Sequence, residues 1–270
     1  MGLDEQHVES RMPEPVANNS HDISDAHTLK PPLKGRRAII TGGTTGIGRA
    51  IAVLLASEGT KVFICGRDPD HLADALQRIG EVGEGAGTTA DLAEPADMER
   101  FFAEAEKFLG TIDIAVINAA VPAEALAETN AEDTAYQIAV DFTAYLTSTQ
   151  QAAARMKAGS DIVLIGSMSA VSRAGGSSIY VAAKSGIQGF AKSLREELSE
   201  RDIKVGLIEP GFTGADFQYP EFPPEKQREL IHQDRMLRAE DIAVATQFML
   251  TQPRRTAVSL MRVETRLEHP

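Results

Sequence analysis

A tyrosine and a lysine four residues apart are the part of this sequence best suited to chemistry. Tyr180 and Lys184 lie in the stretch IYVAAKSGIQGF, whose apolar spacing predicts a helix, so both side chains share one helix face. A phenol has an ordinary pKa near ~10, and a neighbouring ammonium lowers it, so the pair can act as an acid and a base. The two side chains can also simply pack together on a surface, and only a pocket around them would indicate catalysis.

A glycine-rich turn near the start of the chain predicts such a pocket. The segment TGGTTGIGRA follows the buried strand pattern RRAIIT and leads into the helical pattern GIGRAIAVLLASEG. Glycines at this kind of turn permit positive φ angles and a close backbone approach, and the free amides of the helix N-terminus bind a pyrophosphate. We therefore expect dinucleotide binding rather than a plain tight turn. The residues expected at the cofactor are Gly42, Thr44, Thr45, Gly46, Ile47 and Gly48.

The end of the second predicted strand bears on which dinucleotide is bound. An Asp or Glu at this point binds the ribose 2′-hydroxyl of NAD, but here the strand KVFIC runs into Gly66 and Arg67. Gly66 leaves room for a phosphate and Arg67 offers a planar fork of donors, which favours NADP(H) over NAD(H). Two alternatives stay open: Arg67 decorates a turn, or Asp68 binds the ribose. Asp91 and Leu92, at the end of the third predicted strand, are candidates for the adenine edge, although an Asp at a strand-to-helix junction is as often a turn former.

Strand patterns and helix patterns alternate along the rest of the chain. Strands are predicted near 87–92, 112–118, 161–167, 203–210 and 258–263, and helices near 70–79, 96–109, 131–156 and around Tyr180. This alternation predicts parallel strands joined by right-handed crossovers, in a doubly wound α/β sandwich with a Rossmann fold. We assign residues 33–270 to one such domain, and residues 1–32, which are polar, acidic and interrupted by prolines, to a flexible tail.

Composition excludes several classes of protein. The formal net charge of −12 disfavours nucleic acid as a partner, and no run of roughly 18 or more apolar residues is present to cross a membrane. The single cysteine, Cys65, cannot form an internal disulfide, and the histidines His7, His21 and His27 lack the spacing of a metal site. We expect a cytoplasmic protein that acts on a small molecule, with no bound metal ion.

Several motifs in this order resemble those of the short-chain dehydrogenase/reductase family, in its compact single-domain branch, over roughly residues 33–265. TGGTTGIG is similar to the family's cofactor turn, INAA to its Asn-Asn-Ala-Gly segment, IGS to its serine strand, YVAAK to its catalytic pair and EPGF to its Pro-Gly turn. The resemblance implies an oxidoreductase that interconverts a ketone or aldehyde and an alcohol with NADP(H), as a homodimer or homotetramer. It implies catalytic roles for Ser167, Tyr180 and Lys184, a substrate-side position for Ser169, and cofactor contacts from Asn118, Ala119, Tyr180, Lys184, Pro210, Gly211 and Thr213.

Departures from the family pattern affect the candidate site. The family's first asparagine and its glycine are Ile117 and Ala120 here, at small structural cost. The threonine expected after the Pro-Gly turn is Ala215, and we assign its contact with the carboxamide to Thr213. The helix asparagine of the family's proton relay is Asp141. An ionised Asp141 would oppose the charge of the catalytic lysine, a buried one can stay protonated and mimic the amide, and one that points elsewhere forms an ordinary helix contact.

Two other functions are compatible with parts of this pattern. A Rossmann-type sensor that binds the cofactor without turnover would keep the glycine turn, but the presence of Ser167, Tyr180 and Lys184 favours an enzyme. Sugar-nucleotide epimerisation is disfavoured because it needs a large C-terminal substrate domain. The substrate itself is not predicted. A segment near 212–237 carries aromatic side chains that either face the substrate or pack inward, namely Phe212, Phe217, Tyr219 and Phe222.

Overall fold

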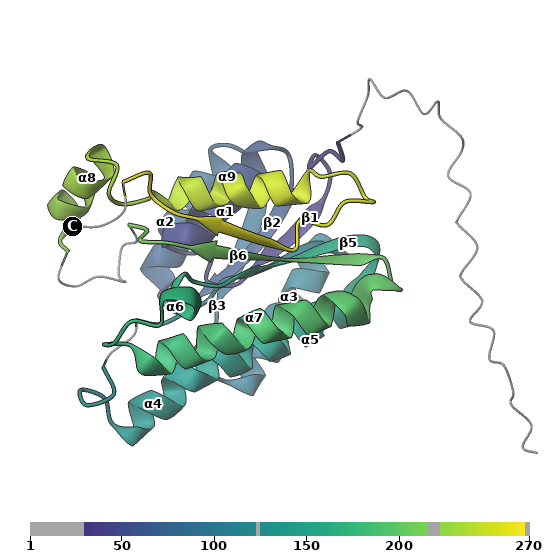
Figure 1. Cartoon of the computed structure of the whole chain (residues 1–270). Helices are drawn as coiled ribbons and strands as arrows, with labels where there is room; N and C mark the ends of the chain where they lie inside the picture. Colours follow the sequence, from purple (N-terminus) through teal and green to yellow (C-terminus); the bar gives the residue numbers. More distant parts are fainter. Residues whose placement is uncertain (1–29, 123–124, 215–221, 268–270) are drawn as a thin grey trace, which may run out of the picture.

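Seven parallel strands form one sheet in the order β3-β2-β1-β4-β5-β6-β7 in the computed structural model, which describes residues 30–122, 125–214 and 222–267. Figure 1 shows this sheet between two layers of helices. The strands are β1 (Arg37–Ile40), β2 (Lys61–Gly66), β3 (Gly85–Thr89), β4 (Ile112–Ile117), β5 (Met156–Ile165), β6 (Ile203–Pro210) and β7 (Leu260–Val263). The helices are α1 (Gly46–Ser57), α2 (Pro69–Gly80), α3 (Pro95–Leu109), α4 (Ala131–Ile138), the π-helix η1 (Ala139–Thr143), α5 (Ala144–Arg155), α6 (Ser169–Ser172), α7 (Ser178–Ser199), α8 (Pro224–His232) and α9 (Ala239–Leu250).

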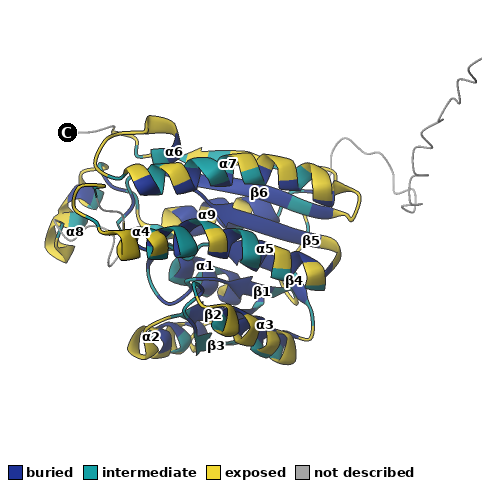
Figure 2. Cartoon of the chain, turned by 90° about the horizontal axis from the view of Figure 1, so that it is seen from below, coloured by how far each residue is buried: buried dark blue, intermediate teal, exposed yellow. Residues whose placement is uncertain are grey.

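The strands bury both of their faces against helices. In β1, Ile39 packs into one apolar cluster with residues of α3, α5 and α7, whereas Ala38 and Ile40 pack into a second cluster with residues of α1, α2 and α9. This division follows from the pleat, which points successive side chains to opposite faces of a sheet. Figure 2 shows the strands buried and the helices exposed on the sides that are turned away from them. The predicted doubly wound α/β fold in a single domain is confirmed.

Local sequence signals set the helix starts. Asp68 caps α2, since its Oδ1 accepts hydrogen bonds from the backbone N–H groups of Asp70 and His71 at 2.8 and 2.9 Å, and Pro69 follows in the first turn. Asn130 caps α4 in the same way, and Pro95 begins α3. These helices therefore begin where the sequence predicts them.

Two predicted elements differ from the structure. The third strand ends at Thr89, so Asp91 and Leu92 lie in the loop beyond it rather than in the strand. The helix predicted over 131–156 is interrupted by the π-helix η1 and ends at Arg155, and β5 begins at once at Met156. A π-helix arises from i→i+5 hydrogen bonds and has no simple mark in the apolar periodicity.

The strand order reverses direction between β1 and β4, which are direct neighbours although two strands separate them in sequence. In a doubly wound sheet, the loops at the carboxyl ends of such strands diverge and leave a crevice that binds ligands. The glycine turn follows β1, Asn118 follows β4 and Ser167 follows β5. The fold thus brings these predicted residues to one edge of the sheet.

The predicted tail lies mostly outside the described residues, which begin at residue 30. Leu33 is buried, and its carbonyl oxygen accepts a hydrogen bond from the hydroxyl of Thr60 at 3.0 Å. The chain is thus packed against the domain from that residue onward.

Candidate active site

The turn between β1 and α1 forms a tight backbone cradle. Gly42 and Gly46 have positive φ angles of 63° and 49°, which residues with a side chain rarely adopt. A Cβ atom on Gly48 would lie 2.1 Å from the carbonyl oxygen of Gly42, so only glycine lets α1 begin this close to the loop. Asn118 braces the loop, because its Nδ2 donates to the carbonyl oxygens of Thr41 and Gly42 at 3.2 and 3.1 Å. The cradle therefore holds the N-terminus of α1, where free amides favour an anion, in a fixed position.

Two adjacent cavities lie next to this cradle. Their volumes are about 560 and about 650 Å³. They share the lining residues Ile47, Asn118, Ala120, Val121 and Pro122, so they lie side by side along one cleft. The first cavity is lined by the predicted cofactor residues Gly42, Thr44, Thr45, Gly46, Ile47, Arg67, Asp91, Leu92, Asn118 and Ala119. The second is lined by Ser167, Ser169, Tyr180, Lys184, Pro210, Gly211 and Thr213. Gly48 and Asp141 are not among the lining residues of either cavity.

The loop after β2 lines the outer part of the first cavity with opposite charges. Arg67 and Asp68 both belong to this wall. Asp68 is engaged as the cap of α2, and the hydrogen bond from the His71 amide lowers the pKa of its carboxyl. The room that Gly66 was predicted to leave for a phosphate is taken by Thr44, because a Cβ atom at residue 66 would lie 2.2 Å from Thr44 Oγ1. Gly66 therefore lets the glycine turn pack against β2, and any contact with a phosphate depends on Arg67.

The tyrosine and the lysine lie together in the second cavity, on the first turns of α7. Tyr180 is half-buried, whereas only 1% of Lys184 is exposed. The Nζ atom of Lys184 lies 5.4 Å from the centre of the Tyr180 ring. Burial lowers the pKa of Lys184 to about 8, an effect that the nearby Asp141 carboxylate partly opposes. The lysine is thus an ammonium at neutral pH and acts on the phenol through a medium from which water is largely excluded.

Ser167 is the second residue of the loop after β5 and lines the same cavity. Its Oγ accepts a hydrogen bond from the backbone N–H of Ser169 at 3.1 Å. This contact uses a lone pair and leaves the hydroxyl hydrogen for an acceptor in the cavity. Ser167 can therefore donate to an oxygen bound near Tyr180.

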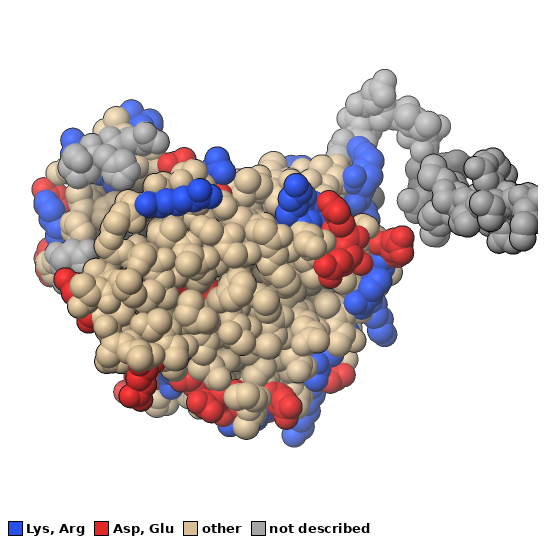
Figure 3. Space-filling model, turned by 60° about the horizontal axis from the view of Figure 1, so that its bottom comes forward, with Lys and Arg blue, Asp and Glu red and all other residues tan. Residues whose placement is uncertain are grey.

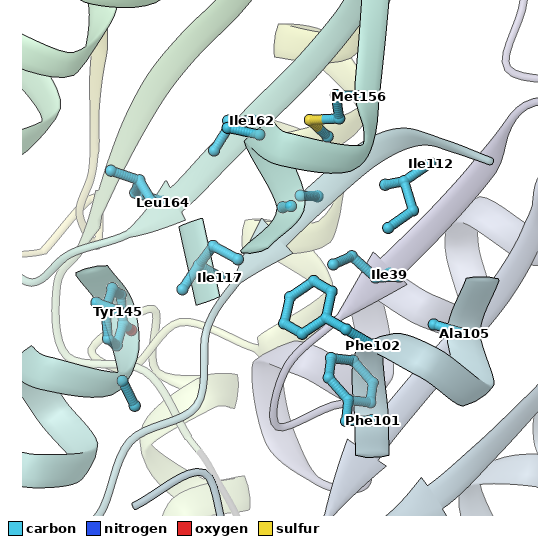
Figure 4. Packing of buried hydrophobic residues seen from close by; sticks show 14 of the residues in the cluster. Ile39, Phe101, Phe102, Ala105, Ile112, Ile117, Tyr145, Met156, Ile162 and Leu164 are labelled. Atoms are coloured by element: carbon cyan, nitrogen blue, oxygen red, sulfur yellow. The ribbon is translucent and has the colours of Figure 1, made fainter. Parts of the chain in front are cut away.

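A second tyrosine, Tyr145 of α5, holds the lysine from behind. Its ring is 1% exposed, and its hydroxyl accepts a hydrogen bond from Lys184 Nζ at 2.8 Å. The same hydroxyl lies 2.9 and 3.1 Å from the carbonyl oxygens of Ile165 and Asn118, to which it can donate. Tyr145 belongs to the buried apolar cluster of this layer, of which Figure 4 also labels Ile117 and Leu164. Tyr145 was not predicted from the sequence, because its partner Lys184 lies 39 residues away in the chain.

Asp141 lies in the π-helix η1, behind the wall of the cleft. It is fully buried, and its Oδ1 accepts a hydrogen bond from the backbone N–H of Val121 at 2.9 Å. Its Oδ2 has no hydrogen-bond partner within the described part of the chain. Burial raises the pKa of this carboxyl to about 6, and the attraction of Lys184 opposes that rise. The charges of Asp141 and Lys184 therefore act on each other through the buried interior.

The Pro-Gly turn after β6 lines the second cavity beside the serine and the tyrosine. Thr213 is buried, and its hydroxyl donates to the carbonyl oxygen of Gly211 at 3.0 Å, so its oxygen can still accept. Phe212 and Phe222 pack edge to face with ring centres 5.5 Å apart. Each ring therefore covers part of the apolar surface of the other. Ala215, Phe217 and Tyr219 lie outside the described residues.

Comparison with known proteins identifies this arrangement. A profile of the short chain dehydrogenase family matches residues 36–226. The chain belongs to the short-chain dehydrogenase/reductase family. It is 30% identical to carbonyl reductase family member 4 of Xenopus laevis over 217 residues, which is 79% of this chain and 90% of the relative. It is also 30% identical to the 3-oxoacyl-[acyl-carrier-protein] reductase of Bos taurus, with the same shares of the two chains covered.

Solved structures of this family share the fold. A short-chain dehydrogenase from Burkholderia cenocepacia J2315, crystallised with NADP, superposes with a TM-score of 0.78 at 26% identity, over 87% of this chain and 98% of the other. As a member of the short-chain dehydrogenase/reductase family, the chain is an oxidoreductase, which favours an enzyme over the non-catalytic sensor.

Two negative findings concern the described residues only. None of the helices formed by residues 30–122, 125–214 and 222–267 is long and apolar enough to span a membrane. Within those same ranges, no three His, Cys, Asp or Glu side chains cluster as they would around a metal ion.

Proposed function

We propose that this short-chain dehydrogenase/reductase interconverts a ketone or aldehyde and the corresponding alcohol with NADP(H), and that Tyr180 is its acid and base. The observation that carries the proposal is the position of Tyr180 and Lys184 in a cavity that shares five lining residues with the cavity beside the glycine cradle. A dinucleotide in the first cavity would therefore lie next to a substrate in the second.

The residues of the first cavity fit a nicotinamide dinucleotide. The cradle at Gly42 and Gly46 has the conformation that lets a backbone approach a pyrophosphate, at a helix N-terminus that favours anions. Asn118 joins the two cavities, and Thr213 offers an acceptor oxygen for a carboxamide. When bound, the cofactor supplies or accepts the hydride.

The chain's own residues then handle the charge that develops on the substrate oxygen. Ser167 donates a hydrogen bond to that oxygen, and Tyr180 delivers a proton to it. To serve as an acid and base at neutral pH, a phenol must lower its pKa by about 3 units, or roughly 4 kcal/mol. The ammonium of Lys184 lies 5.4 Å from the ring centre. A unit charge about 5 Å from the phenol oxygen would contribute about 3 kcal/mol at an effective dielectric constant of roughly 20. Lys184 is therefore the proposed source of most of the required field.

Arg67 is the basis for the proposed preference for NADP(H) over NAD(H). It lines the outer part of the first cavity, and a guanidinium binds a phosphate through several charge-assisted hydrogen bonds. The carboxylate that could serve a ribose hydroxyl, Asp68, already caps α2. We expect Arg67→Ala to raise the KM for NADPH about tenfold or more without changing that for NADH. Equal efficiency of the native enzyme with both cofactors would contradict this preference.

A direct assay tests the proposed reaction. Purified enzyme is incubated with NADPH and a panel of ketones, aldehydes and 3-oxoacyl thioesters, the last chosen because of the activity named for a relative. Loss of NADPH absorbance that depends on both enzyme and carbonyl compound supports the proposal. Tight cofactor binding with no turnover across a broad panel would favour the sensor.

We also infer that two or more copies of the chain associate through α5 and α7. Figure 3 shows a broad face with few charged side chains and with acidic and basic groups at its rim. A shallow groove between the two helices is lined by Leu146, Gln150, Ala153, Ala154, Phe190 and Leu194, among others. Because Ala154 is exposed, Ala154→Glu should lower the oligomeric state without disturbing the core. Sedimentation of the native chain as a monomer would contradict the inference.

A further inference from the structure

We infer that Tyr136 of α4 is a specificity-determining residue, which holds Arg67 in position for the 2′-phosphate of the cofactor. This inference rests on the proposed use of NADP(H). It concerns the outer end of the first cavity, where α4 meets the loops after β2 and β3, and not the reacting end.

A chain of hydrogen bonds joins three elements at that end. Arg67 Nη1 donates to the hydroxyl of Tyr136 at 2.6 Å, and this hydroxyl donates to Asp91 Oδ2 at 2.7 Å. The other oxygen of Asp91 accepts a hydrogen bond from the backbone N–H of Ala93 at 3.0 Å. The guanidinium carbon of Arg67 also lies 5.7 Å from the centre of the Tyr136 ring. Each group in the chain therefore has a defined partner on the next element.

The phenol separates the cation from the carboxylate. If Arg67 paired with Asp91 directly, the pair would be nearly neutral and the carboxylate would repel a phosphate. With Tyr136 between them, the guanidinium contacts a neutral hydroxyl instead of the carboxylate. Partial burial and the hydrogen bond to Asp91 raise the pKa of Tyr136, so that the phenol keeps its proton. The bridge thus keeps the carboxylate from pairing directly with the guanidinium.

The bridge also prepares the geometry of Arg67. An exposed arginine at a strand end has many rotamers, and ordering it on binding is unfavourable. Tyr136 occupies one N–H of Nη1, and the edge formed by Nε and Nη2 is the one that binds a phosphate in bidentate fashion. A ribose 2′-hydroxyl has no charge and gains little from this edge. Tyr136 should therefore matter for NADPH and hardly at all for NADH.

The test measures equilibrium binding of NADPH and NADH, and of the fragments adenosine 2′,5′-bisphosphate and adenosine 5′-monophosphate, to four variants. Tyr136→Phe removes the hydroxyl and keeps the ring. Arg67→Ala removes the cation, and the double variant combines the two. Thr134→Val is the matched control, because it removes a hydroxyl from the same helix at a half-buried position.

We expect Tyr136→Phe to weaken NADPH and the bisphosphate about fivefold to tenfold, with NADH and the monophosphate changed less than about twofold. Arg67→Ala should weaken NADPH further, and adding Tyr136→Phe to it should have no further effect, because both act through one group. The control should bind all four ligands normally.

The failures of the two ideas are distinguishable. Normal discrimination by Tyr136→Phe alongside lost discrimination by Arg67→Ala would overturn the role of Tyr136 and leave the NADP(H) preference in place. Equal weakening of all four ligands by Tyr136→Phe would assign Tyr136 a general structural role and also overturn the inference. Unchanged NADPH binding by Arg67→Ala would overturn both.

Discussion

Two buried aspartates, one near each end of the sheet, differ in how their carboxylates are paired. At the end remote from the cleft, Asp161 on β5 has its side chain 6% exposed and pairs with Arg36 at 2.6 Å, Arg254 at 3.2 Å and Lys204 at 3.4 Å. At the cleft, Asp141 is equally inaccessible, yet one of its oxygens has no hydrogen-bond partner among the described residues. We call the first group the Asp161 ion cluster and the second the Asp141–Lys184 pair.

The difference lies in how many partners the fold gives to each buried carboxylate. A buried charge surrounded by opposite charges contributes to holding the structure together, and removing it leaves those charges unpaired. A buried charge without enough partners shifts its pKa instead, and such groups gather where proton transfer is needed. We therefore expect a structural role for the Asp161 ion cluster and a functional role for the Asp141–Lys184 pair, and each expectation can be tested.

The largest effect should come from the tyrosine that the Asp141–Lys184 pair serves. Tyr180→Phe removes the proposed acid, so ketone reduction should fall by about 10³-fold or more while NADPH binding stays within about twofold. Steady-state rates and a cofactor titration measure the two quantities. Considerable residual turnover would mean that another group supplies the proton.

At the opposite end, Asp161→Asn should lower stability and leave catalysis intact. Three cations lose their shared carboxylate, so the free energy of unfolding should fall by about 3 to 5 kcal/mol. The matched control is Asp113→Asn, whose ion pair with Arg37 is partly exposed and should contribute less than about 1 kcal/mol. Urea unfolding measures both, and turnover per folded molecule should stay unchanged. A changed pH profile of turnover in Asp161→Asn would contradict the purely structural role of this aspartate.

Asp141→Asn should have the opposite effect on stability, with a defined pH dependence. The folded-state pKa of Asp141 is raised from 3.8 to about 6, so its favourable contribution is complete below about pH 4 and is lost as the pH rises through about 6. The amide does not titrate. Above pH 7 the variant should therefore gain up to about 3 kcal/mol relative to the native chain, and near pH 4 the difference should vanish. Urea unfolding of both proteins at the two pH values measures this effect. A difference in unfolding free energy that does not change with pH would contradict the raised pKa of Asp141.

Tyr145→Phe should reduce turnover by about tenfold. The ammonium of Lys184 loses an acceptor at 2.8 Å, which should lower the pKa of the lysine below its value of about 8. At high pH, kcat/KM should fall as Lys184 loses its proton, and this fall should occur at lower pH in the variant. Asp161→Asn is the useful comparison, because it destabilises the chain without touching the lysine. Loss of stability with an unchanged profile would reduce Tyr145 to a packing residue.

The smallest expected effect concerns alcohol oxidation by Asp141→Asn. An ionised Asp141 offsets part of the field of Lys184 on Tyr180, so its removal should lower the apparent pKa that governs oxidation by about half a unit. The pH dependence of kcat/KM for the alcohol measures this shift. An unchanged profile with unchanged activity would remove Asp141 from the mechanism and leave only its effect on stability.

Much of the fold and part of the site could be predicted because their signals are local. Apolar periodicity and helix caps such as Asp68 depend on a few neighbouring residues, and so does the glycine turn. The spacing of Tyr180 and Lys184 already places them on one helix face. The π-helix at Asp141 was not predicted. It is defined by i→i+5 backbone hydrogen bonds, and the residue types of this short segment do not distinguish it from an α-helix.

The order of strands and helices, the cradle after β1 and the pairing of a phenol with an ammonium could be predicted from the sequence, since each follows from residues close together in the chain. The groups that surround this pair and the outer cavity became known from the folded chain. The hydroxyl of Tyr145 meets a lysine 39 residues away, and that of Tyr136 joins partners 45 and 69 residues away. Such contacts depend on how the helices pack over the sheet, and no local pattern encodes that packing.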